Sequence, residues 1–267
     1  MDVIGARIPG GCQVLRQLAR GAVARVFLAS DGSTLKAVKL FPPEYRSRAE
    51  REFALGRGLD HPHLNPVTAA AAVRGFPGVV MPFVPGVRFG AWVDSAHDLT
   101  QVLECFTGVL AALGWLHEHG IVHRDVKPEN VLVDSRHHAR LLDFDLAARM
   151  GDPRQPKFVG TMAYVSPEQA QGLRATPASD LYSAGVMLFR ALTGQLPFDG
   201  TAAEVVKAHV NQAAPAASSL NPALTPFDAL LHKLLNKEPE RRCQRAGEIA
   251  EALERIAGQA DLPVRWR

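Results

Sequence analysis

The stretch His123-Arg124-Asp125-Val126-Lys127-Pro128-Glu129-Asn130 gathers several polar groups in a short loop, and Asp143-Phe144-Asp145 begins thirteen residues after Asn130. A carboxylate such as Asp125 can accept the proton of a hydroxyl group, and a lysine two residues later can neutralise charge that builds on a phosphoryl group. Asn130 and Asp143 carry the oxygen atoms that magnesium prefers. Few reactions other than phosphoryl transfer from a nucleotide need these groups in this order.

The composition excludes several classes of protein. Of the 267 residues, 47% are apolar and 21% are charged, which is an ordinary globular balance. The length suits one large domain or two lobes and is ample for a core. The net charge of +3 is small and no long run of Lys or Arg occurs, so we expect no nucleic-acid partner.

The cysteines and the apolar stretches bear on the cellular location. Cys12, Cys105 and Cys243 lie far apart and form no CxxC pair, which favours a reduced, cytoplasmic protein. The chain opens without the basic segment and apolar run of a secretory signal. The longest apolar stretches, such as Val67–Val73 and Gly185–Leu192, are too short to cross a membrane, so we expect no membrane segment.

The first eighty residues have the alternation and the turn residues of short strands, with one helix among them. Ser47 with Glu50 three residues later fits a capping box, which predicts a helix over Ser47–Leu59. The predicted strands are Gln13–Leu18, Val23–Ala29, Thr34–Phe41, Val67–Val73 and Val79–Val84.

After Val84 the apolar spacing becomes helical. A boundary between a small β-rich lobe and a larger helical lobe is therefore expected near Pro82–Gly86, which gives lobes of residues 1–83 and 84–267 within a single domain. The predicted helices are Leu99–His117, Ser179–Leu192, Phe227–Leu235 and Ala246–Ile256.

Taken together, these motifs resemble a eukaryotic-like (Hanks-type) serine/threonine protein kinase of the kind found in bacteria, and the match runs from about Val14 to Arg242. The resemblance implies an α+β, bilobal protein-kinase-like fold, with a small antiparallel β-sheet lobe that has one key helix and a larger, mainly helical lobe. It also implies ATP and Mg²⁺ as cofactors, with Mn²⁺ as an alternative metal. The implied partner is a protein substrate with a Ser or Thr acceptor, and a regulatory partner protein is a further expectation.

The resemblance assigns roles to the two loops and to one buried lysine. Asp125 becomes the catalytic base, or the group that orients the substrate hydroxyl, while Lys127 supports the γ-phosphate; Asn130 and Asp143 become the metal ligands. Lys39, in Lys36-Ala37-Val38-Lys39, corresponds to the lysine that contacts the α- and β-phosphates. Its expected partner is a glutamate on the following helix, for which Glu50 and Glu52 compete. Glu52 is favoured because Glu50 is better used in the capping box.

The chain departs from the family pattern at two places. The glycine-rich loop keeps only Gly21, since Ala19 and Ala24 replace the other two glycines, which predicts a stiffer lid over the phosphates. Asp145 replaces the glycine of Asp-Phe-Gly. It either restricts the change of this loop between active and inactive forms or binds metal directly, and restriction is favoured.

The segment Gly160-Thr161-Met162-Ala163-Tyr164-Val165-Ser166-Pro167-Glu168 resembles the end of an activation segment. By this resemblance, Thr161 contacts Asp125 and Lys127, Glu168 pairs with Arg242, and Asp180 braces the backbone of the catalytic loop. Residues 146–160 contain no Ser, Thr or Tyr. We therefore hypothesise that phosphorylation of this segment does not switch the protein on, with Asp152 as a permanent, weaker anion.

The resemblance also implies an adenine site, with Met81 as its gatekeeper and Pro82–Val84 as its hinge. The carbonyl of Pro82 is expected to face the adenine amine, and the N–H of Val84 is available. The apolar members of the site could equally be ordinary core residues. The complete predicted nucleotide-binding set is Leu18, Gly21, Val26, Ala37, Lys39, Met81, Pro82, Val84 and Leu132.

Two other functions compete with an active protein kinase. A catalytically weak or inactive kinase-fold scaffold, which binds nucleotide or a partner, is suggested by Ala19, Ala24 and Asp145. Phosphorylation of a small metabolite is the third alternative, but relatives of that kind usually lack the activation segment and the Glu168–Arg242 pair.

Overall fold

The computed structural model describes residues 1–95, 97–152 and 162–259, and these form two compact units. The first contains Met1–Pro85 and Leu142–Ala147, and the second contains Gly86–Leu141 and the described part of Ala148–Arg267. The sequence-based division after residue 83 did not assign Leu142–Ala147 to the first unit. They belong there because Asp143 and Asp145 pair with Lys39 and Arg48.

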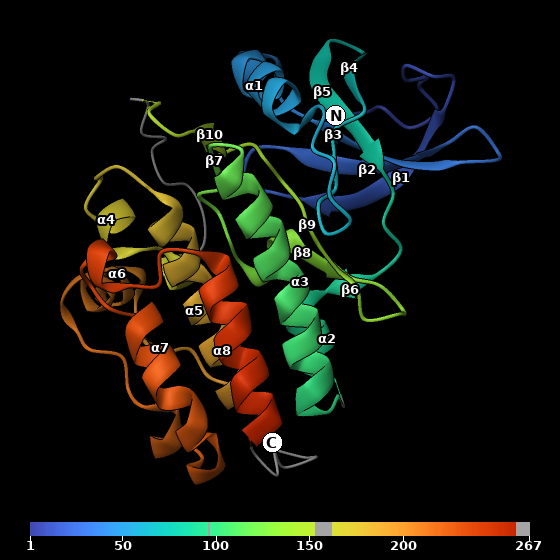
Figure 1. Ribbon diagram of the computed structural model, residues 1–267. Helices are drawn as coiled ribbons and strands as arrows, with labels where there is room; N and C mark the ends of the chain where they lie inside the picture. The colour runs from blue at the N-terminus through green and yellow to red at the C-terminus, as the bar shows by residue number, and fades with distance from the viewer. Residues whose placement is uncertain (96, 153–161, 260–267) are drawn as a thin grey trace. The chain divides into compact units, whose positions relative to one another are not determined.

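The first unit is built on a five-stranded antiparallel sheet with the strand order β1-β2-β3-β5-β4 (Figure 1). In its register, Ala37 lies opposite Met81 and Lys39 lies opposite Val79. All five predicted strands are present, within a few residues at their ends. Their bounds are β1 Gln13–Arg20, β2 Arg25–Ser30, β3 Leu35–Leu40, β4 Ala69–Val73 and β5 Phe76–Pro82.

Side chains alternate between the two faces of this sheet, since successive residues of a strand point to opposite sides. On β3, Val38 and Leu40 join a large buried cluster with Val3 and Ile8 of the N-terminal segment. Ala37 instead joins a second cluster with Val67, Val79 and Met81. Lys39 has the same parity as Ala37, so the alternation places it on the face of that second cluster.

Helix α1 (Arg46–Gly56) packs against β4 and β5 on this sheet (Figure 1). The predicted capping box of Ser47 and Glu50 is wrong, because Tyr45 is the N-cap and its side chain makes no capping bond. A short 3₁₀ turn over Pro43–Tyr45 leads directly into the helix, so Ser47 already lies inside the first turn. Glu50 is exposed, whereas Glu52 is buried.

The second unit is mainly helical and carries two small antiparallel sheets, β10-β7 and β6-β8-β9. The four predicted helices are present as α3, α5, α7 and α8, whereas α2, α4 and α6 were not predicted. Their bounds are α2 Phe89–Val93, α3 Leu99–Glu118, α4 Pro167–Ala170, α5 Pro177–Thr193, α6 Ala202–Asn211, α7 Asp228–Leu234, α8 Ala246–Gln259, β6 Val87–Arg88, β7 Ile121–Val122, β8 Val131–Val133, β9 Ala139–Leu141 and β10 Ala148–Arg149.

Helices α3 and α5 form the centre of this unit. Helix α3 contacts α5, α8, β7 and β9, and α5 contacts α7 at Gly185, where an added Cβ atom would lie 2.8 Å from the Cβ atom of Leu234. Within the described residues, α3 is also the one helix long and apolar enough to cross a membrane, with a mean hydropathy of 1.5. Because 61% of that stretch is buried inside the protein, α3 fits the core helix of a folded unit at least as well as a membrane span.

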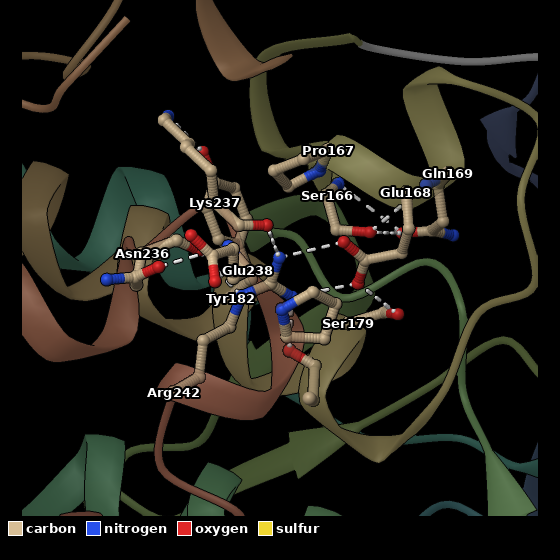
Figure 2. Close-up of polar contacts among 12 residues, drawn as sticks. Ser166, Pro167, Glu168, Gln169, Ser179, Tyr182, Asn236, Lys237, Glu238 and Arg242 are labelled. Atoms are coloured by element: carbon tan, nitrogen blue, oxygen red, sulfur yellow. Dashed lines mark hydrogen bonds and ion pairs between the residues drawn. The ribbon is translucent and has the colours of Figure 1, made fainter. Parts of the chain in front are cut away.

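A buried ion pair joins Glu168, in the segment after residue 161, to Arg242, which lies shortly before α8 (Figure 2). The two terminal nitrogens of Arg242 each donate to one oxygen of Glu168, at 2.8 Å. Arg242 also donates to the carbonyl groups of Ala178, Asn236 and Lys237. Burial alone would raise the pKa of Glu168, but the hydrogen bonds and the charge of Arg242 outweigh burial and hold that pKa below its ordinary value. The predicted pair is therefore present, with its guanidinium group satisfied on every nitrogen.

A second buried chain of hydrogen bonds reaches the same segment. The ammonium group of Lys237 donates to the Tyr182 hydroxyl at 3.2 Å, and that hydroxyl lies 3.0 Å from His209 Nδ1. His209 Nε2 lies 3.1 Å from the carbonyl oxygen of Ala163. Since a carbonyl oxygen only accepts, Nε2 carries the proton and Nδ1 accepts from Tyr182. Burial, reinforced by the charge of Lys237, lowers the pKa of His209 to about 4, so the ring is neutral near pH 7.

Replacing Glu168 with glutamine should destabilise the protein strongly. The change leaves the guanidinium of Arg242 buried without an opposite charge, and breaking a buried pair in this way costs about 3–5 kcal/mol. The measurement is the free energy of unfolding in urea, with Glu254→Gln, the same change at an exposed position of α8, as the control. Equal unfolding midpoints for the two variants would show that the pair does not hold this unit together.

Acid should destabilise the protein through His209. The folded-state pKa is about 4, below the ordinary value of 6.5, so the unfolded chain binds more protons between these pH values and stability falls as the pH falls through that window. The shift corresponds to a loss of up to about 3 kcal/mol. We expect His209→Gln to flatten the pH dependence of the unfolding free energy between pH 6.5 and 4, while the exposed control His232→Gln keeps the wild-type slope. An unchanged slope in His209→Gln would contradict this assignment.

Candidate active site

The predicted catalytic loop, residues 123–130, lies in the second unit between β7 and β8, and its polar side chains contact one another. Lys127 Nζ lies 2.8 Å from Asp125 Oδ1 and 2.7 Å from Asp125 Oδ2. The amide nitrogen of Asn130 donates to Asp125 Oδ2 at 2.9 Å and to the Asp125 carbonyl at 2.8 Å. The structure therefore brings Asp125, Lys127 and Asn130 together. Since the amide nitrogen of Asn130 is committed to Asp125, its amide oxygen is the atom suited to a cation.

A buried carboxylate holds this loop in a strained conformation. Arg124 has φ 69°, in the left-handed region that a residue with a bulky side chain rarely adopts. Asp180, at the start of α5, accepts hydrogen bonds from the backbone N–H groups of His123 and Arg124, both at 2.8 Å. His117 Nε2 lies 2.9 Å from the same carboxylate. Asp180 thus braces the loop backbone as predicted, and its bonds oppose the strain, which is of the order of 1–3 kcal/mol.

The first unit contains the other half of the predicted set, around the ammonium group of Lys39. Lys39 Nζ lies 3.1 Å from Glu52 Oε1 and 2.6 Å from Asp143 Oδ1. Burial alone would lower the pKa of Lys39, but the charges of Asp143 and Glu52 outweigh it and raise that pKa, so the lysine is charged. Burial also raises the pKa of Glu52, an effect that Lys39 opposes. The partner of Lys39 is therefore Glu52, as predicted, and not the exposed Glu50.

The Asp143 loop also contains a strained residue, and an ion pair that was not predicted from the sequence. Asp143 has φ 67°, whereas Asp145, which replaces the family's glycine, is not among the residues with positive φ. The backbone N–H of Asp145 donates to Asp143 Oδ1 at 3.2 Å. The Asp145 carboxylate binds both Nε and Nη2 of Arg48 on α1, with Nε 2.8 Å from Oδ1. Asp145 was expected to restrict this loop, and Arg48 is the residue to which it is bound.

Four members of the predicted adenine site lie in one apolar cluster of the first unit. Ala37 and Met81 are buried there, and Leu18 and Val26 pack against them half-buried. The Pro82 carbonyl, which was expected to face the adenine amine, accepts a hydrogen bond from Asn65 Nδ2 at 3.2 Å, so only one of its lone pairs remains available. Two further members of the predicted set are Val84, buried in the first unit, and Leu132, half-buried on β8 of the second.

The hairpin that replaces the glycine-rich loop is closed by a hydrogen bond from the Gly21 N–H to the Ala24 carbonyl, at 2.9 Å. A Cβ atom at position 21 would lie 3.3 Å from that carbonyl oxygen, which makes glycine the best fit. Ala24 is buried against Phe41 and Ala49, so the methyl group at the third glycine position is part of a core that joins the hairpin to α1. This packing role gives a physical reason for a stiffer hairpin.

The predicted activation-segment residue Thr161 lies outside the described residues, and its expected contacts with Asp125 and Lys127 stay predictions. The segment that follows is ordered by its surroundings. Ser183 Oγ donates to the Tyr164 carbonyl at 2.7 Å, and Gln169 Nε2 donates to the Arg124 carbonyl at 2.9 Å. The latter bond ties the described end of this segment to the catalytic loop.

The donor chemistry of the predicted metal ligands suits magnesium. Mg²⁺ binds through one or two carboxylates together with substrate phosphates and water, and it does not need a cage of protein ligands. Asp143 supplies a carboxylate whose side chain is 37% exposed, and Asn130 supplies an amide oxygen. Because Asn130 belongs to the second unit and Asp143 to the first, a shared metal site stays a prediction.

Comparisons with known proteins agree with these observations. The family described as protein kinase domain matches residues 12–255. The probable serine/threonine-protein kinase PknB of Lactococcus lactis is 30% identical, over 99% of this chain and 44% of that protein. Serine/threonine-protein kinase PrkC of Bacillus subtilis is 31% identical, over 97% of this chain and 42% of that protein. The chain thus spans less than half the length of these curated relatives.

A solved structure matches the fold along nearly the whole chain. The kinase domain of PknI from Mycobacterium tuberculosis, crystallised as a point mutant, superposes with a TM-score of 0.74 at 26% sequence identity, and the match covers 95% of this chain and 98% of that one. The predicted fold class is confirmed: an antiparallel sheet with one key helix in the first unit, and a larger, mainly helical second unit.

Replacing Asp180 with asparagine should lower the stability of the second unit. The asparagine amide has no negative charge, whereas the Asp180 carboxylate accepts hydrogen bonds from two backbone N–H groups and lies beside His117. Hydrogen bonds to charged groups are worth about 1.5–3 kcal/mol each. We expect a loss of about 3 kcal/mol in the unfolding free energy, measured in urea beside Asp199→Asn, the same change at an exposed position. A loss no larger than that of the Asp199 variant would mean that Asp180 does not carry the strained loop.

Proposed function

The chain belongs to the protein kinase domain family, and from that membership we propose that it transfers the γ-phosphate of ATP to Ser or Thr hydroxyl groups of protein substrates. The relatives in the comparison are named as bacterial serine/threonine-protein kinases. The observation that carries the proposal is that the described residues of the predicted catalytic set gather around one side chain in each unit. Asp125 contacts Lys127 and Asn130 in one unit, and Lys39 contacts Glu52 and Asp143 in the other.

In this reaction each polar group has a separate task. Asp125, held by Lys127 and Asn130, accepts or orients the proton of the substrate hydroxyl. Lys127 and Lys39 supply positive charge, the former toward the transferring phosphoryl group and the latter toward the α- and β-phosphates. Catalysis then rests on positioning and charge neutralisation, with no covalent intermediate on the protein.

ATP and Mg²⁺ are the proposed cofactors, with Mn²⁺ as the alternative metal. When bound, the metal neutralises phosphate charge, and Asn130 and Asp143 are the residues that would hold it. The apolar cluster of Leu18, Val26, Ala37 and Met81 would receive the adenine ring, together with Val84 and Leu132. The Pro82 carbonyl keeps one lone pair for the adenine amine.

A protein substrate is favoured over a small metabolite by the order in the segment before α5. Residues Tyr164–Glu168 are held by Ser183, by Arg242 and by the link to the catalytic loop. A small-molecule acceptor would not need this ordered segment next to the catalytic loop. The substrate itself, and any regulatory partner protein, are further proposals, as is a reduced cytoplasmic location, which the three buried, unpaired cysteines support.

We also propose that phosphorylation of the activation segment does not switch the protein on, because residues 146–160 of that segment offer no hydroxyl group to modify. Mass spectrometry of the purified, active protein should find no obligatory phosphate on Thr161. Activity that required such a phosphate would overturn the idea.

Labelled-phosphate transfer from MgATP, to the protein itself and to a generic basic protein, tests the proposed function. We expect label on Ser or Thr, reduced at least about 100-fold in Asp125→Asn and abolished in Asp143→Asn. The control is Asp199→Asn, the same change at an exposed site, which should keep wild-type activity. If wild-type protein bound ATP in a thermal-shift assay but transferred none of its phosphate, the chain would act as the nucleotide-binding scaffold that Ala19, Ala24 and Asp145 suggest.

A further inference from the structure

One face of helix α1 meets the Asp143 loop at three successive turns. Arg48, Glu52 and Gly56 are spaced four residues apart, so they lie along one side of the helix. Arg48 binds Asp145, and Glu52 shares Lys39 with Asp143. At Gly56 an added Cβ atom would lie 3.6 Å from Cδ2 of Phe144, a ring that is only 1% exposed. Each residue of the Asp143-Phe144-Asp145 sequence therefore has a counterpart on this face of α1: Glu52 through Lys39, Gly56 and Arg48, respectively.

The contact at Arg48 is stronger than an ordinary surface ion pair. Exposed pairs contribute little because water screens them and both side chains lose freedom. Here the side chains of Arg48 and Asp145 are only 18% and 11% exposed. Two nitrogens of one guanidinium group meet two oxygens of one carboxylate, which adds directional specificity to the attraction.

Asp145 transmits this contact to Asp143. Its backbone N–H donates to Asp143 Oδ1, the same oxygen that pairs with Lys39. Asp143 itself is held at φ 67°, a conformation that persists only where its surroundings enforce it. A glycine at position 145 would keep the N–H but would have no side chain for Arg48 to bind.

We propose that Arg48 is a positioning residue, which grips Asp145 and so holds the Asp143 carboxylate beside Lys39 and Glu52 before any nucleotide or phosphate arrives. The inference deepens the proposed function and rests on it for its catalytic meaning. It also assigns Asp145 to anchoring the loop and not to binding metal, since both of its oxygens face a guanidinium charge that would repel a cation.

The consequence concerns apparent affinity more than the maximal rate. A loop that samples several positions binds nucleotide only from its competent fraction, so the apparent affinity falls in proportion to that fraction. Saturating MgATP can then restore the competent arrangement. A residue that only stabilised the fold would lower the melting temperature without this selective change in KM.

The test compares Arg48→Met, Asp145→Gly and the double variant with wild type, and uses Arg46→Met, at an exposed position of the same helix, as the control. One readout is amide hydrogen exchange of residues 142–147 in the nucleotide-free protein, and the other is kcat and KM for MgATP. We expect faster exchange and a rise in KM of about tenfold in each single variant, with kcat changed far less. The double variant should be no worse than either single one, because both remove the same contact. Arg48→Lys, which keeps the charge but loses the two-pronged geometry, should fall between wild type and Arg48→Met.

Wild-type exchange and wild-type KM in Arg48→Met would overturn the proposal. So would effects of Arg48→Met and Asp145→Gly that multiply in the double variant, or an effect of Asp145→Gly alone, since either would mean that Asp145 acts without Arg48. The exchange measurement needs no activity. If wild-type protein transferred no phosphate, the proposed function would fail, while the exchange of residues 142–147 would still decide whether Arg48 positions the loop.

Discussion

The first unit depends on the buried ion pairs that the ammonium group of Lys39 makes with Glu52 and Asp143. Lys39 is 5% exposed, and its ammonium group is shared by two carboxylates, one on α1 and one on the Asp143 loop. Removing such a charge from water is costly, and it is tolerated because opposite charges and good geometry replace the lost hydration. Glu52 and Asp143 are far apart in the sequence, and this cation links strand β3, helix α1 and residues 142–147 within the first unit, beside the Arg48–Asp145 pair. The predicted nucleotide-binding cluster lies on the same face of the sheet.

In the second unit a buried negative charge, the carboxylate of Asp180, holds separate segments of the chain together. The carboxylate of Asp180 gathers two backbone N–H groups and His117, and it thereby holds Arg124 at a positive φ. Each unit thus contains a strained residue among or next to its predicted catalytic side chains, Asp143 in the first and Arg124 in the second. Strain of this kind is typical of sites where the backbone must place a functional group that regular structure would not. The Glu168–Arg242 pair adds a second buried ion pair, which holds the segment after residue 161 against α5.

Sequence reasoning predicted the strands, the long helices and the polar side chains that gather in each unit, because each has a local signal: alternation, helical spacing, or fixed separation within a motif. It placed a capping box at Ser47 where the helix had already begun, since a 3₁₀ turn at Pro43 moved the true start upstream. It missed α6, although Thr201 and Glu204 form the capping box that announces this helix. It could not find Arg48 as the partner of Asp145, because 97 residues separate them and no local pattern relates the two. The bond from Asn65 to Pro82 was missed for the same reason.

The central claim is that one buried cation orders both α1 and the Asp143 loop, and Lys39→Met tests it most directly. Methionine fills similar space without charge, and amide hydrogen exchange can be followed in the nucleotide-free protein. If the account is right, residues 46–56 and 142–147 will exchange faster together, while helix α3, which belongs to the second unit, stays protected. Unchanged exchange in both segments, or a change in only one of them, would contradict the claim that Lys39 joins them.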